Sequence, residues 1–401
     1  MNDFIFYSPT KFIFCRGAAT LTGQQLSSLG FKNTLIVYGG SSAISSGLIQ
    51  KVKTSLDNSH ISCVELSGIR PNPEVTSVRQ GIKLARENKC DSILAVGGGS
   101  VIDAAKAISF GINYSGDVWD FFEGRAIIKE CLPVSVVLTL PAAGSEGSAS
   151  CVISNDEIKA KRGIGSDAMR PRLAFLDPET TFSLPAYQTA AGVTDMIAHV
   201  CERYFSGAPD APITDSLATS LIKELIKAAP EAIKNPTSYD ARASIMWAGT
   251  LAHNDLMGCG RSLNVNSRAG GWESHALEHE LSAVDPKITH GAGLAVMMPK
   301  WMEYVWREDP TRFIKFGRDV FGISPETQSK NDIEKSVLLT IEKLKSFFVS
   351  IGMPNSLSDF GLDRSQVDSL LTGLEKSKGR IFGAFKKLSP EDARAIYLSA
   401  F

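Results

Sequence analysis

One aspartate and several histidines in the C-terminal half have the spacing of a metal site. The chain has 401 residues but only six histidines. Asp195 and His199 are four residues apart, and His275 and His279 repeat that spacing, which places both members of a pair on one face of a helix. His290 follows after a short break. Asp195, His199, His275 and His290 together offer one carboxylate and three imidazoles, a set that suits Fe²⁺ or Zn²⁺.

Each of these residues also has a purely structural interpretation. An Asp–His pair four residues apart is often a surface pair on a helix, and a single histidine in an apolar helix is usually hydrogen-bonded in the core. The helix expected around Asp195 is mostly apolar, however, with Val193, Met196, Ile197 and Val200. A carboxylate in such surroundings is unfavourable unless it is paired or bound to a metal.

Three turns rich in glycine and serine follow β-rich runs in the N-terminal half. They are Gly39-Gly40-Ser41-Ser42, Gly97-Gly98-Gly99-Ser100 and Pro141–Gly147. Glycine lets the backbone approach a diphosphate, and a helix that begins at such a turn favours phosphate at its N-terminus. An open α/β sheet holds its nucleotide at the carboxyl ends of its strands. None of the three turns reads GxGxxG, so loops that only shape the chain are the alternative.

The turn at Gly39 also predicts which nicotinamide cofactor is used. A carboxylate near the ribose would repel a 2′-phosphate. No Asp or Glu occurs between Phe31 and Ser55, and the Ser41 and Ser42 hydroxyls can donate to phosphate. We therefore expect NADP(H), unless an acidic residue from elsewhere in the fold lies beside the ribose.

The elements that must position these residues divide the chain in two. Strands are expected at 12–14, 34–38, 61–66, 92–96, 134–140 and 173–176, with helices at 43–56, 73–87 and 101–110 between them. This alternation predicts a parallel sheet covered on both faces. From Pro185 on, only helices are expected, at 186–205, 215–232, 239–256, 271–283, 291–305, 332–351 and 363–376. We expect an α/β dinucleotide-binding domain at 1–184 and an all-helical metal-binding and substrate domain at 185–401.

Composition excludes several classes of protein. Lys plus Arg is 42 and Asp plus Glu is 43, so the balanced charge gives no basic surface for nucleic acid or anionic membrane. No apolar run approaches the roughly 18 residues that span a bilayer, and the first residues do not form a secretory signal. The seven cysteines include no CxxC pair, which fits a reducing cytoplasm.

Motifs along nearly the whole chain resemble one family. They are Ser8-Pro-Thr-Lys-Phe-Ile-Phe, Gly97-Gly-Gly-Ser-Val-Ile-Asp-Ala-Ala-Lys, Leu138-Thr-Leu-Pro-Ala-Ala-Gly-Ser-Glu, Phe175-Leu-Asp-Pro, Gly192-Val-Thr-Asp, His275-x3-His279-Glu-Leu and Thr289-His-Gly-Ala-Gly-Leu-Ala-Val. With these motifs the chain resembles the iron-containing, group III alcohol dehydrogenases, in the branch of NADPH-dependent butanol dehydrogenases and aldehyde reductases. The resemblance implies a Rossmann-like N-terminal domain, a helical C-terminal domain, a cleft between them and a homodimer.

The resemblance also implies roles for individual residues. The metal ligands would be Asp195, His199, His275 and His290, with His279 close to the metal but not bound to it. The positions implied to contact the cofactor are Gly39, Ser41, Gly98, Ser100, Asp103, Thr139 and Lys161. We add the neighbouring Gly40, Ser42, Gly97, Gly99, Leu140 and Ser145 to the expected cofactor site.

The expected reaction is reversible hydride transfer between NADP(H) and a primary alcohol/aldehyde pair, with the metal ion as Lewis acid. His279 is the candidate proton relay, and support of a metal ligand is the equal alternative. His253 could border the site or be buried packing. Glycerol dehydrogenases and dehydroquinate-synthase-like cyclases share this two-domain plan and stay open, as does a non-catalytic protein that senses a nucleotide or metal.

Three features depart from the family pattern. Ala143 stands where many relatives have Thr. The interval from His275 to His290 is one residue longer, with Asp285-Pro286-Lys287 in the loop. The stretch 258–271 is longer or altered and is expected to reshape the substrate pocket.

Overall fold

The computed structural model describes residues 1–40 and 43–401, and its chain groups into two compact units. The unit we call the sheet unit contains Tyr7–Leu184 and Thr237–Thr250. The helical unit contains Met1–Phe6, Pro185–Pro236 and Leu251–Phe401. A single division after residue 184 does not produce these units. Met1–Phe6 groups with the helical unit, and Thr237–Thr250 groups with the sheet unit. The division of the folded enzyme into domains stays a prediction.

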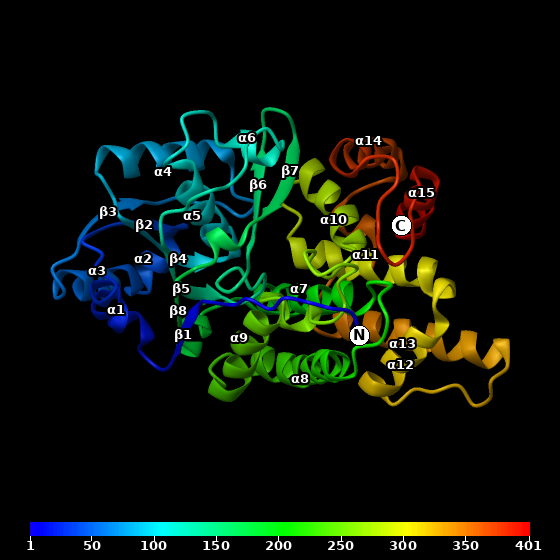
Figure 1. Cartoon of the computed structure of the whole chain (residues 1–401). Coiled ribbons are helices and arrows are strands. Elements are labelled where there is room, and N and C mark those ends of the chain that lie inside the picture. The colour runs from blue at the N-terminus through cyan, green and yellow to red at the C-terminus, as the bar shows by residue number, and fades with distance from the viewer. The chain divides into compact units, whose positions relative to one another are not determined.

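A six-stranded parallel sheet forms the centre of the sheet unit (Figure 1). Its strands run in the order β1-β8-β5-β4-β2-β3. All five neighbouring pairs are parallel. The strands are β1 (Lys11–Phe14), β2 (Asn33–Tyr38), β3 (Ser62–Leu66), β4 (Ser92–Gly98), β5 (Val134–Leu140) and β8 (Leu173–Leu176). Each of the six strands predicted from the sequence is confirmed within a few residues.

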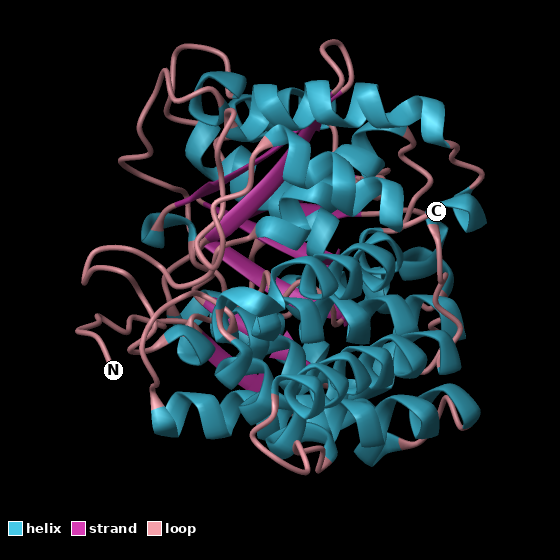
Figure 2. Ribbon diagram, turned by 90° about the vertical axis from the view of Figure 1, so that its right-hand side faces the viewer, coloured by secondary structure: helices cyan, strands magenta, loops and turns pink.

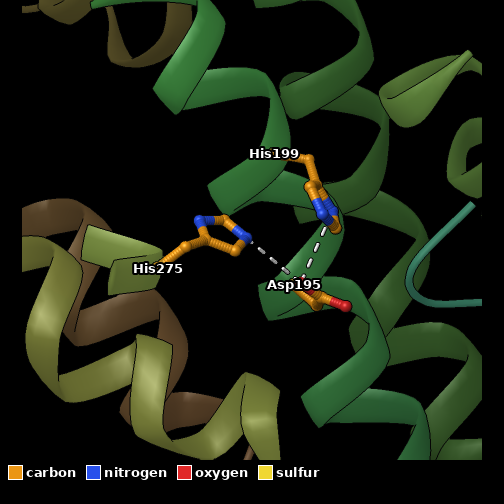
Figure 3. Close-up of side chains that lie close together, drawn as sticks. All are labelled: Asp195, His199 and His275. Atoms are coloured by element: carbon orange, nitrogen blue, oxygen red, sulfur yellow. Dashed lines mark ion pairs between the residues drawn. The ribbon is translucent and has the colours of Figure 1, made fainter. Parts of the chain in front are cut away.

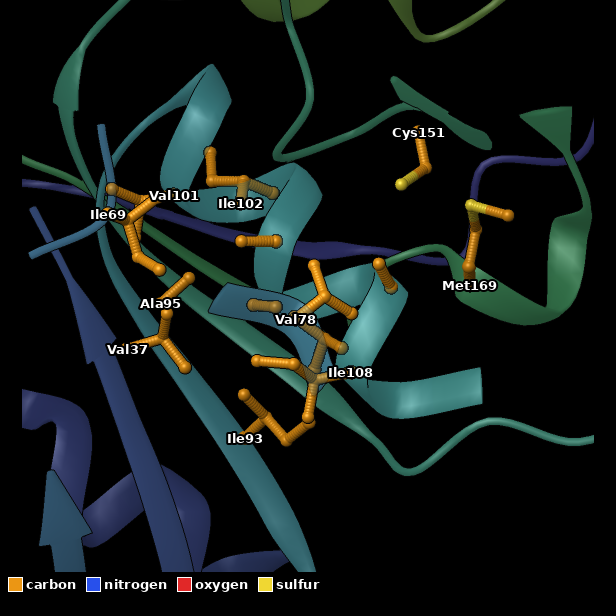
Figure 4. Packing of buried hydrophobic residues seen from close by; sticks show 14 of the residues in the cluster. Val37, Ile69, Val78, Ile93, Ala95, Val101, Ile102, Ile108, Cys151 and Met169 are labelled. Carbon is orange, nitrogen blue, oxygen red and sulfur yellow. The ribbon is translucent and has the colours of Figure 1, made fainter. Parts of the chain in front are cut away.

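Helices cover both faces of this sheet because alternate strand residues point to opposite sides. Leu35 and Val37 pack with α4 (Val75–Glu87), α5 (Gly99–Gly111) and α6 (Trp119–Phe122), whereas Ile36 and Tyr38 pack with α1 (Thr22–Ser28) and α3 (Leu48–Asp57). Figure 4 shows the first cluster, in which Ala95 of β4 lies among apolar side chains of α5. This dense packing fixes the turn between β4 and α5, where the nucleotide is expected.

Two local features of the sheet unit differ from the prediction. The helix expected at 43–56 is two helices, α2 (Ser41–Ser45) and α3, because Gly47 between them has a left-handed φ of 72°. A hairpin of β6 (Ser150–Asn155) and β7 (Ala160–Gly165) was not expected. Its second strand carries two glycines and two adjacent basic residues, so it lacks the alternation that indicates a strand.

The helical unit confirms the all-helical prediction, since from Ala186 onward the described residues form helices and no named strand. Figure 2, coloured by secondary structure, shows that most of the molecule is helical. Its helices are α7 (Ala186–Tyr204), α8 (Pro212–Lys234), α10 (Glu273–Val284), α11 (His290–Val305), α12 (Pro310–Phe321), α13 (Lys330–Ser350), α14 (Val367–Lys378) and α15 (Pro390–Ser399). The helix α9 (Tyr239–His253) contributes its residues up to Thr250 to the sheet unit. The sequence interpretation missed α12 and α15. In the described part of the chain, no helix has the length and apolar character needed to cross a membrane.

Candidate active site

Three helices of the helical unit bring the four predicted metal ligands together. Helix α7 carries Asp195 and His199 one turn apart, α10 carries His275 and α11 begins at His290. The Asp195 Oδ1 atom lies 3.4 Å from His199 Nδ1 and 3.7 Å from the Nε2 atoms of both His275 and His290. Figure 3 shows the Asp195 carboxylate facing the rings of His199 and His275. One carboxylate oxygen is therefore the centre on which three imidazoles converge.

These polar atoms are buried without hydrogen-bond partners. Asp195, His199 and His275 are each no more than 5% exposed. Among the described residues, Asp195 Oδ1, His199 Nδ1 and His275 Nε2 have no hydrogen-bond partner. Leaving buried polar atoms unpaired is costly, and such atoms are rare unless a bound group satisfies them. A divalent cation held among them satisfies all three at once, so the residues fit the predicted metal ion.

The electrostatics of the four residues favour a cation. Burial raises the pKa of Asp195, but the charges of His199, His290 and His275 outweigh it and hold that pKa well below its usual value. Burial lowers the pKa of His275, yet the nearby carboxylates of Asp195 and Glu202 raise it to about 9. A metal ion bound here must therefore displace a proton from His275, so metal binding becomes weaker as the pH falls.

Two buried glutamates that the sequence interpretation missed contact the Nδ1 atoms of two candidate ligands, whose Nε2 atoms face Asp195. The Glu202 Oε1 atom lies 3.2 Å from His275 Nδ1, and Glu278 Oε2 contacts His290 Nδ1. Both glutamates are fully buried. A signal for them exists in the sequence, since each stands three residues after a predicted ligand, in His199-x-x-Glu202 and His275-x-x-Glu278.

His253, Arg203 and Trp272 form a wall beside His199. The His253 and His199 ring centroids are 4.1 Å apart, and His253 Nδ1 lies 3.0 Å from an Arg203 guanidinium nitrogen. That guanidinium also lies 4.7 Å from the Trp272 ring. The Trp272 ring forms T-shaped contacts with the rings of His199, His253 and His275. These contacts hold His253 against the candidate ligand His199, so His253 borders the candidate metal centre.

The backbone of Trp272 is strained. Its φ of 58° lies in the left-handed region, which a bulky side chain adopts only under constraint. The residue is the N-cap of α10, three positions before His275. The altered stretch 258–271 thus ends at a residue whose conformation sets the position of both an aromatic wall and a candidate ligand.

His279 lies at the margin of the histidine cluster. Its half-buried ring is 5.3 Å from the His290 ring and 6.5 Å from the His275 ring, between centroids. The structure thus brings it close to two candidate ligands, while its role in proton transfer stays a prediction. The longer interval before His290 does not keep that residue away, because its Nε2 reaches within 3.7 Å of Asp195.

The three predicted nucleotide-binding turns lie side by side in the sheet unit. Strands β5, β4 and β2 are neighbours and parallel, so the turns that follow them meet at one edge of the sheet. Gly39 and Gly40 follow β2, Gly97 and Gly98 end β4, Gly99 and Ser100 begin α5, and Thr139 and Leu140 end β5. Ser41 and Ser42 lie outside the described residues.

Close packing explains part of the glycine content of these turns. A Cβ atom at Gly97 would lie 2.6 Å from the Val101 side chain, and one at Gly98 would lie 2.9 Å from Leu140. A Cβ at Gly99 would meet Ala143 at 3.0 Å. The strand-to-helix turn therefore requires glycine for its own shape, whether or not a diphosphate binds there.

Asp103 and Ser145 belong to a buried network that ties the turn after β5 to α5. The Ser145 hydroxyl donates to Asp103 Oδ1 over 2.6 Å and accepts from Lys106 Nζ over 2.9 Å. The Val152 backbone N–H of β6 donates to Asp103 Oδ2 over 2.9 Å. Burial raises the pKa of Asp103, while the charge of Lys106 and, to a smaller extent, that of Lys161 on β7 lower it. The network gives Asp103 and Ser145 a structural role that the sequence interpretation did not foresee, and their contact with a cofactor stays a prediction.

Comparison with known proteins identifies the family. Residues 9–178 match the family described as iron-containing alcohol dehydrogenase, and residues 189–401 match the C-terminal part of the Fe-containing alcohol dehydrogenase family. The chain is 37% identical over 402 residues to NADH-dependent butanol dehydrogenase A of Clostridium acetobutylicum, covering 100% of both chains. It is 35% identical over 406 residues to the NADPH-dependent aldehyde reductase YqhD of Escherichia coli, again covering 100% of both.

The solved structures give the same result. The crystal structure of NADH-dependent butanol dehydrogenase A from Thermotoga maritima matches with a TM-score of 0.93 at 36% identity, covering 100% of this chain and 99% of that one. The family matches account for both halves of the chain, and the helical half supplies the clustered aspartate and histidines. The chain belongs to the iron-containing alcohol dehydrogenase family, a family of alcohol and aldehyde oxidoreductases.

Proposed function

We propose that this alcohol dehydrogenase transfers hydride reversibly between NADP(H) and primary alcohol/aldehyde pairs, and acts mainly as an aldehyde reductase with Fe²⁺ or Zn²⁺. One observation carries the proposal: the convergence of His199, His275 and His290 on Asp195 Oδ1, with buried atoms that only a bound cation would satisfy. A structural histidine cluster would instead pair these atoms with donors and acceptors of the chain.

The proposed chemistry divides between the ion and the chain. When bound, the divalent ion supplies Lewis acidity toward the alcohol or aldehyde oxygen. Asp195 and the three histidines hold the ion, and Trp272 and Arg203 keep His199 and His253 in place beside it. His279 moves a proton at its ring nitrogen, or else supports His290 from its position next to that ring.

The preference for NADP(H) rests on the residues after β2. No acidic residue occurs between Phe31 and Ser55, so nothing in this stretch would repel a 2′-phosphate. The relatives do not decide the matter, since the Clostridium acetobutylicum enzyme is named NADH-dependent and YqhD is named NADPH-dependent. Comparing kcat/KM with NADPH and NADH decides it, and a higher value with NADH would overturn the preference.

The rival functions are less well supported by the site. A cyclase that acts on a phosphorylated substrate requires basic residues that face the substrate, and the stretch 258–271 offers Arg261 and Arg268. The Arg261 guanidinium is fully buried, bonded to Asp215 over 3.0 Å and to the Tyr204 carbonyl over 2.6 Å. Oxidation of NADPH with an aliphatic aldehyde as substrate would favour the proposed function over a glycerol dehydrogenase and would exclude a non-catalytic metal-sensing protein.

Metal removal tests the proposal directly. Dialysis against a chelator should abolish NADPH oxidation with butanal, and Fe²⁺ or Zn²⁺ should restore it. The His275→Ala variant should lose bound metal and activity together, whereas His60→Ala, at an exposed histidine, should lose neither. Full activity after verified metal removal would refute the proposed role of the ion.

We also propose that the chain forms a homodimer and works in a reducing cytoplasm. Strand β1 lies at an edge of the sheet, and Phe14 on it is 38% exposed beside Trp247, which is 39% exposed. An unpaired edge strand with apolar side chains favours pairing with another chain. Light scattering would reveal the dimer, and a monomer at working concentration would exclude it.

A further inference from the structure

The sequence pattern His-x-x-Glu occurs twice in the candidate metal centre. His199 and Glu202 stand on α7, and His275 and Glu278 stand on α10. On a helix, residues three apart lie one turn apart on nearly the same face. Each helix therefore presents a candidate ligand and, one turn further on, a buried carboxylate.

Glu202 connects α7 to α10. Its Oε1 atom accepts the backbone N–H of His275 over 3.1 Å and the Ser274 hydroxyl over 2.6 Å, and it lies 3.2 Å from His275 Nδ1. Its Oε2 atom accepts the backbone N–H of Glu273 over 3.2 Å. The side chain of Trp272, the N-cap residue of α10, forms no capping bond. Glu202 thus takes the place of a capping residue and satisfies the first turn of α10 from another helix.

Glu278 connects α10 to α11 in the same way. Its carboxylate contacts the Nδ1 atom of His290, the first residue of α11, and the hydroxyl of Ser282. A Cβ atom at Gly293 would lie 2.7 Å from Glu278 Cγ, so only glycine at that position lets the carboxylate lie against α11. The link therefore depends on the second glycine of the motif His290-Gly-Ala-Gly.

We propose that Glu202 and Glu278 are positioning residues that orient two of the candidate ligands, an arrangement that we call the relay. Glu202 on α7 orients the His275 ring, and Glu278, on the same helix as His275, orients the His290 ring. The inference rests on the metal centre of the proposed function. Each glutamate accepts the Nδ1–H of its histidine, which leaves the lone pair on Nε2, the nitrogen that faces Asp195. Together with Asp195 they place three carboxylates around one divalent cation, so the site favours positive charge before the ion arrives.

Each glutamate contributes a hydrogen-bond acceptor and a negative charge, and substitutions can separate these two contributions. Glutamine keeps an oxygen that accepts the Nδ1–H but removes the negative charge, whereas alanine removes both. The loss of an outer carboxylate of this kind weakens metal binding by roughly 10- to 100-fold. We expect Glu278→Gln to weaken binding of Co²⁺ about 10-fold and Glu278→Ala to weaken it more, with the same order for Glu202.

The experiment uses the purified full chain and Co²⁺ alone as the probe. Competition with a chelating dye gives the affinity, and the visible absorption bands of bound Co²⁺ report the ligand geometry. Gly293→Ala should reproduce the spectral change of Glu278→Ala, because its new methyl group pushes the carboxylate away. Glu280→Gln is the matched control on the same helix, since the Glu280 carboxylate accepts the Ser377 hydroxyl.

The outcomes separate the relay from the metal centre. Weaker Co²⁺ binding and altered bands in the Glu278 variants, with an unchanged control, support the relay. Wild-type affinity and spectrum in Glu278→Gln, Glu278→Ala and Gly293→Ala overturn it while the metal centre stands, and this test holds even if the Glu202 variants fail to fold. A second Co²⁺ per chain that disappears with Glu278→Gln would make Glu278 a ligand and also overturn it. A wild-type chain that binds no Co²⁺ would refute the metal centre itself.

Discussion

Gly291 on α11 lies directly against the Ala191 carbonyl of α7. A Cβ atom at Gly291 would come within 1.9 Å of that oxygen, closer than any side chain can approach. The two helices that carry His290 and the Asp195–His199 pair therefore pack backbone to backbone. This contact lies one residue after His290 and four residues before Asp195, so it limits the distance between these candidate ligands.

We expect Gly291→Ala to separate α7 from α11 and weaken the metal site. Overpacking of this kind costs about 1–3 kcal/mol of stability. Because His290 moves with α11, the variant should also lose most of its bound metal and its activity. Metal analysis together with thermal unfolding checks both effects, and Lys287→Ala in the exposed loop before His290 is the control. A variant that retains its full metal content would show that the close contact does not set the ligand distance.

Introducing a carboxylate after β2 should change the cofactor preference. A Cβ atom at Gly39 would lie 3.3 Å from the Ile69 carbonyl and 3.7 Å from Val101, so an aspartate there requires only a small adjustment. Its charge would repel a 2′-phosphate. We expect Gly39→Asp to raise the KM for NADPH at least ~10-fold, about 1.4 kcal/mol of binding energy, and to change the KM for NADH little. Equal losses with both cofactors would mean that the 2′-phosphate does not lie beside this residue.

The four residues that the structure brings together as candidate metal ligands could be selected from the sequence, whereas the two glutamates beside them were missed. The spacing of Asp195 and His199, among apolar neighbours, indicates a candidate pair without any knowledge of the fold. Glu202 and Glu278 read as ordinary helix residues, because a glutamate three positions after a histidine is commonplace. Only the packing of α7, α10 and α11 shows that each carboxylate meets the next helix and not solvent.

The fold was predictable where hydrophobic patterns are strong. The six parallel strands are short runs rich in β-branched and apolar residues, and several end next to glycine, proline or aspartate, so each could be found locally. The β6–β7 hairpin has a second strand of sequence AKRGIG, which no periodicity distinguishes from a loop. Its position depends on tertiary contacts, chiefly the Val152 N–H bond to Asp103.

Lys106 should prove essential to the turn that follows β5. Its fully buried ammonium group donates to the Ser145 hydroxyl over 2.9 Å and to the carbonyls of Ser148 and Ser150 over 3.0 and 2.9 Å. Lys106→Met would leave these acceptors and Asp103 without their cation, at a cost of about 3 kcal/mol. We expect a lower Tm and a higher KM for NADPH, whereas Lys129→Met, at an exposed lysine, should change neither. An unchanged Tm would show that the acceptors find other partners.

Glu273 should make the stability of the chain depend on pH. Its Oε1 atom accepts the backbone N–H groups of Ala384 and Phe385 over 2.6 and 3.0 Å, while its Oε2 atom is buried and has no partner among the described residues. Burial, together with the charge of Glu202, raises the pKa of Glu273 from 4.5 to about 8. The folded chain therefore holds a proton that the unfolded chain releases.

The sign of the pH effect follows from that proton. Between about 4.5 and 8 the folded chain binds more protons than the unfolded chain at Glu273, so its contribution is complete below this range and is lost as the pH rises through it. The loss is at most about 1.4 kcal/mol per pH unit. We expect the Tm of Glu273→Gln, which cannot ionise, to rise relative to that of the wild type between pH 5 and pH 8 and to stay level with further increase in pH. The exposed Glu326→Gln should follow the wild type throughout. The Tm is measured across this pH range in the presence of a chelator, so that metal binding does not contribute to the comparison. A difference in Tm between Glu273→Gln and the wild type that stays constant with pH would mean that Glu273 does not change its protonation on folding.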